Sequence, residues 1–92
     1  MNNAQHQEKN VFLFRIVQSG ENIVIPLTDK NLKSQFKEIY HKLLKKLRLK
    51  QNDVYLSNKK GMMVANSDLG LSLQDIIKKF GSMLKLYYEK IF

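Results

Sequence analysis

Two short apolar runs near the start of the chain alternate in the way that β-strands do. Residues 11–17 (VFLFRIV) and 22–27 (NIVIPL) are rich in β-branched and aromatic side chains, and the polar residues 18–21 between them form a hairpin loop. Successive side chains of a strand point to opposite faces. If Arg15 faces water, the even-numbered residues of this strand therefore point inward. Pro26 lacks an N–H, which predicts that the second strand lies at a sheet edge. The predicted inward set is Phe12, Phe14, Ile16, Ile23, Ile25 and Leu27.

A longer segment then repeats its apolar residues at helical spacing. Thr28, Asp29 and Asn31 are helix-capping residue types, and apolar side chains follow at intervals of three or four for about four turns. We predict one long amphipathic helix with its apolar stripe centred near Phe36 and Leu43. The stripe is Leu32, Phe36, Ile39, Leu43 and Leu47, with Tyr40 and Leu44 at its edge.

The second half of the chain alternates short strands with turns. Residues 53–57 (DVYLS) have strand character, 58–61 (NKKG) predict a turn, and 62–65 (MMVA) predict a short partner strand. After a loop, Asp75 is expected to cap a single helical turn that Gly81 ends, and the last strand follows. That turn contains Ile76, Ile77 and Phe80, and the strand covers residues 83–88 (MLKLYY).

This order of elements predicts an α+β domain, in which a mixed sheet of four to five strands packs on one long amphipathic helix. Leu73-x-Asp75, then eight residues, then Leu84-x-Leu86 resembles the spacing by which ubiquitin-like proteins enter their final strand. The resemblance to this superfamily covers about residues 11–88 and implies the β-grasp fold. We expect one ubiquitin-like domain over residues 11–92, preceded by a disordered polar tail over residues 1–10.

Three branches of the superfamily share short motifs with the chain. Residues 58–61 and 81–84 (GSML) are similar to the ubiquitin-fold modifier. Residues 80–82 (FGS) and Tyr87 are similar to the ubiquitin-like modifier of autophagy, and residues 84–88 (LKLYY) to the small spliceosomal ubiquitin homologue. All three branches stay open.

Composition narrows the class of protein. At 92 residues and 43% hydrophobic, the chain suits one domain with a core of its own. The absence of cysteine excludes disulfides, a thiol nucleophile and thiolate zinc sites. With no apolar signal-peptide core and no window of about 20 apolar residues, we expect an intracellular protein of the cytoplasm, the nucleus or both.

The resemblance also bears on conjugation. Ubiquitin-type transfer needs a flexible tail that ends in glycine, whereas this sequence has no glycine after Gly81 and ends at Phe92. We therefore expect a ubiquitin-like protein that acts without covalent attachment. A conjugated modifier with a truncated or altered end is an alternative.

Candidate catalytic and metal-binding residues are sparse. His6 falls in the polar tail and His41 on the basic helix face, with no second histidine or carboxylate pair at ligand spacing. Gly61, Gly70 and Gly81 are scattered and form no phosphate-binding loop. We expect no enzyme, no cofactor and no metal site.

Binding to another protein is then the leading hypothesis. If Val54, Leu56, Leu84 and Leu86 face the helix, alternation places exposed side chains together on the open face of the sheet, where ubiquitin-like proteins usually meet their partners. The predicted protein-binding residues are Tyr55, Lys85, Tyr87, Leu13 and Val24, with Val11 nearby. The alternative is that Tyr55 and Tyr87 form a cross-strand pair that only strengthens the sheet.

Charge offers a second candidate surface. The formal net charge is +8, and residues 30–50 carry eight Lys or Arg against the single acid Glu38. The predicted basic surface is Lys30, Lys37, Lys45 and Arg48, on the helix face opposite the stripe. It suits a solvated helix face, an acidic protein, anionic lipid or RNA. A small RNA-binding domain is thus a rival function, although only Tyr40 offers an aromatic ring nearby.

Overall fold

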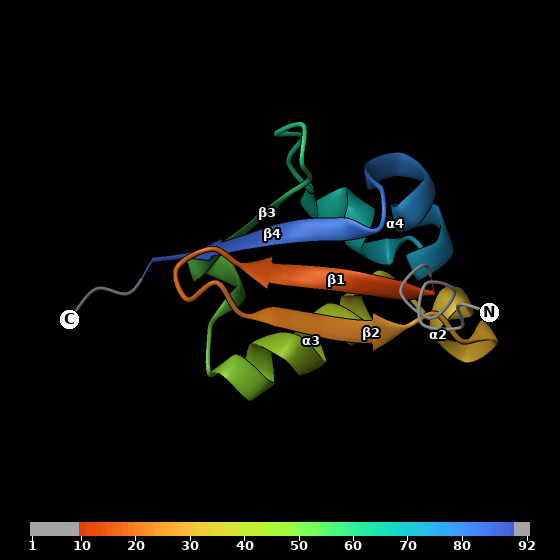
Figure 1. Cartoon of the computed structure of the whole chain (residues 1–92), viewed down its shortest axis with the longest axis horizontal. Coiled ribbons are helices and arrows are strands. Elements are labelled where there is room, and N and C mark those ends of the chain that lie inside the picture. The colour runs from red at the N-terminus through yellow and green to blue at the C-terminus, as the bar shows by residue number, and fades with distance from the viewer. Residues whose placement is uncertain (1–9, 90–92) are drawn as a thin grey trace, which may run out of the picture.

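The computed structural model describes residues 10–89, and its sheet has four strands in the order β2-β1-β4-β3 (Figure 1). Strand β1 (Val11–Ile16) pairs antiparallel with β2 (Asn22–Pro26). Strand β4 (Met83–Tyr88) pairs parallel with β1 and antiparallel with β3 (Val54–Ser57). As predicted, Pro26 lies in an edge strand, β2. The predicted tail lies outside the described residues except for Asn10, as do residues 90–92.

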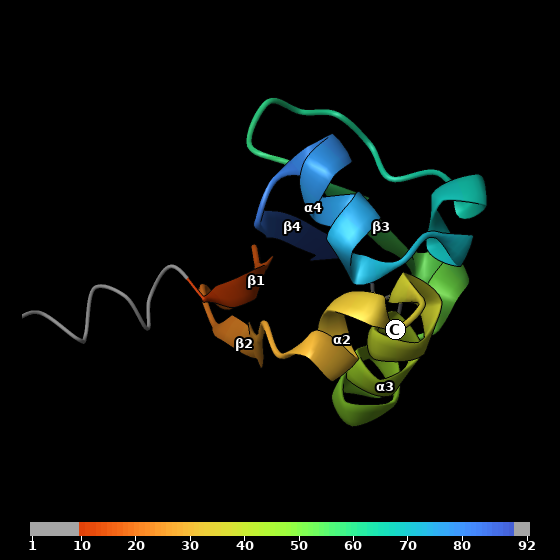
Figure 2. The same ribbon diagram turned by 90° about the vertical axis from the view of Figure 1, so that its right-hand side faces the viewer.

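Helices cover one face of this sheet. Helix α3 (Phe36–Leu47) lies behind it in Figure 1, while α2 (Asp29–Lys33) and α4 (Leu73–Phe80) lie near the end where β4 begins, as Figure 2 also shows. Two short 3-10 helices, η1 (Gln51–Asp53) and η2 (Asn66–Gly70), flank β3 in sequence. None of the described helices is long and apolar enough to cross a membrane.

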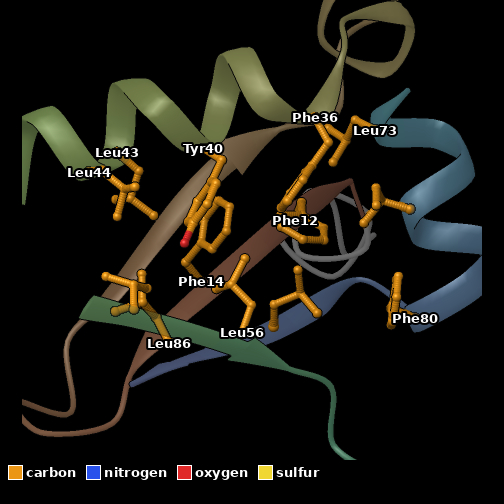
Figure 3. Packing of buried hydrophobic residues seen from close by; sticks show 13 residues of the cluster. Phe12, Phe14, Phe36, Tyr40, Leu43, Leu44, Leu56, Leu73, Phe80 and Leu86 are labelled. Carbon is orange, nitrogen blue, oxygen red and sulfur yellow. The ribbon is translucent and has the colours of Figure 1, made fainter. Parts of the chain in front are cut away.

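Aromatic rings form the centre of the core between sheet and helices (Figure 3). Phe12 and Phe14 are fully buried with ring centroids 5.1 Å apart, and Phe36 stacks on Tyr40 at 5.9 Å. Phe12, Phe14 and Ile16 are therefore buried as the alternation predicts. The matching residues of the second strand, Ile23, Ile25 and Leu27, are half-buried and pack against this core.

The single long helix predicted from the spacing is wrong, because the segment contains two helices. Ser34 and Gln35 are extended, with ψ of 149° and 137°. The Phe36 N–H donates to the Leu71 carbonyl at 2.7 Å, and the Leu73 N–H donates to the Ser34 carbonyl at 2.9 Å. Bonds to residues 71–73 thus replace bonds within a helix at this break.

The break also changes which residues form the apolar stripe. Tyr40 and Leu44, predicted at its edge, are buried at 3% and 4% exposure. Leu32, Ile39 and Leu47 are only half-buried. Once α3 begins afresh at Phe36, its buried positions follow their own helical spacing and Leu32 belongs to another helix. The observed buried set on α3 is Phe36, Tyr40, Leu43 and Leu44.

Two later predictions also need correction. Helix α4 has eight residues rather than one turn, and it begins after Ser72, whose hydroxyl accepts a bond from the Asp75 N–H at 3.2 Å. Ser72, and not Asp75, is the cap, which allows the fully buried Leu73 to join the helix. Residues 62–65 form no strand and pair with β3 only through the isolated bridge between Ser57 and Met63.

Candidate binding surface

Within residues 10–89, no helix covers the face of the sheet turned away from α3, as Figures 1 and 2 show. We call it the open sheet face. Alternation fixes its members, because Val54, Leu56, Leu84 and Leu86 are buried against the helices. Its residues are Val11, Leu13, Arg15, Val17, Asn22, Val24, Pro26, Tyr55, Ser57, Met83, Lys85 and Tyr87.

Strand register arranges these side chains in bands across the sheet. Leu13 lies between Val24 on β2 and Met83 on β4, which makes an apolar band. Arg15 lies beside Lys85, which makes a basic band. Val24 is 52% exposed, whereas Leu13 and Lys85 are half-buried.

A third, aromatic band crosses the far end of the strands. Tyr55 lies directly opposite Tyr87, and the two side chains are 47% and 38% exposed. The Val17 N–H donates to the Leu86 carbonyl at 3.0 Å, which continues the parallel ladder and brings Val17 beside Tyr87. The five predicted residues therefore share one face but belong to three bands. The basic band of Arg15 and Lys85 separates the apolar band from the aromatic band.

A side-chain amide fixes the end of β4 behind the aromatic band. Gln18 donates from Nε2 to the Tyr88 carbonyl and accepts from the Tyr88 N–H at 3.4 Å. The amide thus replaces the backbone pairing that β1 would supply if it ran further.

The predicted basic surface is spread over several elements. Lys37 and Lys45 are exposed on α3, but Lys30 belongs to α2. Arg48 caps α3 in the left-handed conformation, with φ of 58°. Because of the break at Ser34 and Gln35, these four cations do not share one helix face.

His41 gains no catalytic setting among the described residues. His41 is exposed, and its Nε2 lies 3.1 Å from the Gln51 Oε1 on η1, while His6 lies outside the described residues. Within residues 10–89, no cluster of three or more His, Asp or Glu side chains is placed to hold a metal ion. Burial raises the pKa of the Tyr40 hydroxyl to about 12, so this group stays protonated near neutral pH.

A polar cluster around the buried Asp68 joins the segment after β3 to α4. The Lys79 ammonium donates to the Asp68 carboxylate at 2.7 Å, and the Ala65 N–H donates to the same group at 2.8 Å. The bond from Lys79, and after it the bond from Ala65, lowers the pKa of Asp68. The carboxylate is therefore held ionised and fixes Lys79 in place.

Sequence reasoning assigned no binding role to Met83, Arg15 or Val17. Alternation places each of them on the open sheet face, but only the parallel pairing of β1 with β4 brings them beside Leu13, Lys85 and Tyr87. Alternation within a strand tells which side chains share that strand's face, but it does not tell which strand lies beside it. The parallel pairing was the missing information.

Comparison with solved structures identifies the class of fold. The chain resembles an NMR solution structure of a computationally designed protein based on the template of human erythrocytic ubiquitin, with a TM-score of 0.61 and 19% sequence identity. The match covers 90% of this chain and 95% of that one. No family model and no curated protein matches the sequence. The protein thus has the ubiquitin-like α+β fold predicted from its order of elements.

Proposed function

We propose that this protein is a non-catalytic interaction module that binds a partner protein through its open sheet face. One observation carries the proposal: Tyr55 and Tyr87 are paired directly across β3 and β4 and remain well exposed. Tyrosine supplies a large apolar surface and a polar tip at a low cost in conformational entropy, and aromatic residues are enriched among binding hot spots. The ubiquitin-like fold supports the proposal, since it commonly mediates protein interactions.

The charge of the face favours a partner with acidic groups. Arg15 and Lys85 lie between the aromatic and apolar bands, so a docked protein would cover two cations. Carboxylates opposite them would offset the loss of hydration, while apolar groups would cover Val24 and Tyr55. We propose that this binding is non-covalent. Contacts on the open sheet face are enough for it, and it requires no conjugation reaction at the C-terminus.

We further propose that the partner belongs to an intracellular complex of the cytoplasm or the nucleus. The short motifs shared with the ubiquitin-fold modifier, the autophagy modifier and the spliceosomal homologue make those three systems the first to test. The test is affinity capture from cell extract, followed by measurement of binding to the purified partner.

A double variant of the aromatic band separates folding from binding. Tyr55→Ser with Tyr87→Ser should keep the fold, because both side chains point away from the core and a cross-strand pair contributes only about 0.2 to 1 kcal/mol. Binding of the purified partner should weaken at least about tenfold, since loss of one aromatic hot spot costs about 2 kcal/mol or more.

The matched control changes charge away from this face. Lys37, Lys45 and Arg48 changed together to Glu should leave partner binding nearly unchanged. If this triple variant abolishes binding while the double Ser variant binds normally, the interface lies on the helices. Binding to RNA that weakens linearly with the logarithm of salt concentration would then support the RNA-binding alternative.

A separate experiment addresses the conjugated-modifier alternative. Tagged protein expressed in cells should form no adducts that survive heat and detergent. A ladder of covalent products would overturn the non-covalent proposal.

A further inference from the structure

A groove of about 470 Å³ opens where β4 begins, between the turn after β3 and the last turn of α4. Figures 1 and 2 show this turn rising beside α4. Both segments contribute a pair of adjacent lysines. We call it the lysine groove, and its main lining residues are Lys59, Lys60, Lys78, Lys79, Met62 and Met83.

The two lysine pairs are held in a fixed relation by Asn58. This side chain is 5% exposed, and its Nδ2 donates to the Phe80 carbonyl at the end of α4 at 3.2 Å. Its Oδ1 accepts from the N–H groups of Lys60 and Met62 at 3.0 and 2.8 Å. One buried amide thus shapes the turn and ties it to the helix, so the groove exists before any ligand binds.

One lysine of the second pair, Lys79, is also held by its own contacts. Lys79 donates to Asp68 at 2.7 Å, and its ammonium lies 5.4 Å from the centroid of the Phe80 ring. Lys78, by contrast, has no carboxylate within 4.0 Å among residues 10–89, and the same holds for Lys59 and Lys60. With Asp68 counted against the four lysines, the groove keeps three positive charges.

The walls are charged, but part of the lining is apolar. Met62 is 45% exposed, and Ile77 and Met83 are half-buried. Methionine adapts its shape to an apolar ligand group, while the lysine ammonium groups attract carboxylates at the rim. The lining residues include no Asp or Glu.

We propose that the lysine groove binds an acidic peptide segment of a partner protein, with an apolar side chain of that segment against Met62 and Met83. Charge complementarity identifies the occupant. Single-stranded nucleic acid is less well suited, because base binding needs exposed rings and the only ring in the lining, Phe80, is 6% exposed. This site is distinct from the aromatic band, since Tyr55 and Tyr87 lie at the opposite end of the β3–β4 pair.

The test is an NMR titration of the isotope-labelled full chain. The probe is a short synthetic peptide in which two leucines are flanked on both sides by glutamates. Its binding should shift the amide signals of Lys59, Lys60, Met62, Lys78 and Met83. Replacing the glutamates by glutamine, or the leucines by serine, should each weaken binding at least about tenfold.

Protein variants then locate the site. Lys60→Glu with Lys78→Glu should weaken peptide binding by about tenfold or more, because like charges would face the glutamates. The matched control is Lys42→Glu with Lys46→Glu on α3, which changes the net charge equally and should have little effect. The Tyr55→Ser, Tyr87→Ser variant should bind the peptide normally, so this proposal can fail or hold independently of the aromatic band.

Three results would overturn the assignment. The first is equal weakening in the two lysine-to-glutamate variants, which would mean attraction to net charge alone. The second is binding of polyuridylate, with shifts at the groove but no peptide binding, which would make the site one for RNA. The third is binding of phosphatidylserine vesicles, with shifts at the groove but no peptide binding, which would make the groove a lipid-binding site.

Discussion

Asn58 shows how much of the local structure depends on one buried polar side chain. Its amide satisfies a carbonyl at the C-terminus of α4 and two N–H groups of the turn after β3. These groups would otherwise lack partners within the backbone pattern, since the last carbonyls of a helix have none inside it. The residue type fits this role, because Asn can donate and accept at once and favours turns.

Asn58→Ala should lower the free energy of unfolding by about 1 to 3 kcal/mol, because buried polar groups lose their partners. Urea unfolding measures the change. Exposed Asn52→Ala is the matched control and should stay within about 0.5 kcal/mol of the wild type. Equal stability of the two variants would show that the Asn58 contacts contribute nothing net.

Tyr40 predicts a loss of stability at high pH. Its pKa rises from 10.0 to about 12 in the folded protein because the side chain is buried. The unfolded chain therefore releases this proton first, so the stabilisation is complete below pH 10 and is lost as pH rises through the folded-state pKa. The total loss should reach up to about 3 kcal/mol.

The matched variant is Tyr40→Phe, whose free energy of unfolding should decrease less between pH 10 and 12 than that of the wild type. Urea unfolding across this range gives both curves. If the two curves of unfolding free energy against pH run parallel, the Tyr40 hydroxyl does not keep its proton longer in the folded protein than in the unfolded chain.

At the scale of elements, the break between α2 and α3 is the main departure from the pattern of the sequence. Helical periodicity runs through Ser34 and Gln35, yet tertiary bonds to residues 71–73 decide their conformation. Serine at position 34 is a weak signal of the break in the sequence, because serine side chains compete with helical bonding. In the structure, the Ser34 hydroxyl donates to the Lys30 carbonyl at 2.8 Å. That signal alone does not distinguish a break from a continuous helix.

Gln35→Pro tests the break directly. The native φ of −65° matches proline, and the extended Ser34 before it is the conformation that proline requires. Stability should therefore remain within about 1 kcal/mol of the wild type or increase. In a continuous helix the same change would cost about 3 kcal/mol or more.

The control is Lys42→Pro in the middle of α3, which should lose about 3 kcal/mol or more. Thermal and urea unfolding of both variants provide the comparison. Equal destabilisation by the two prolines would mean that the chain is helical through Gln35.

At the scale of the whole molecule, the four observed strands and the inward positions of β1 were predictable because alternation is a local property, although the fifth strand predicted over residues 62–65 was wrong. Phe12, Phe14, Leu84 and Leu86 are all fully buried as expected. The three-band arrangement of the open sheet face was not, because it depends on β4 entering the sheet beside β1. Likewise, the lysine groove requires Asn58 to meet Phe80 across 22 residues of sequence, which no local pattern encodes.

Hydrogen exchange should distinguish the central strands of the sheet from its edge strand and from the turn after β3. The amides of β1 and β4, the two central strands, should exchange most slowly, because they open only with the whole fold. Edge strand β2 and residues 59–65 should exchange faster. Equal protection of residues 59–65 and β4 would contradict this order.

The parallel pairing of β1 with β4 also has a consequence during protein synthesis. Leu13 pairs with Met83, 70 positions later in the chain, so β1 waits for β4, the last strand that the structure describes. Until β4 has left the ribosome, β1, which carries Phe12 and Phe14, lacks this neighbour in the sheet. Unpaired strands of this kind are prone to aggregation. Pairings this distant in sequence also slow folding. The core of this domain is therefore expected to be complete only after residues 83–88 emerge.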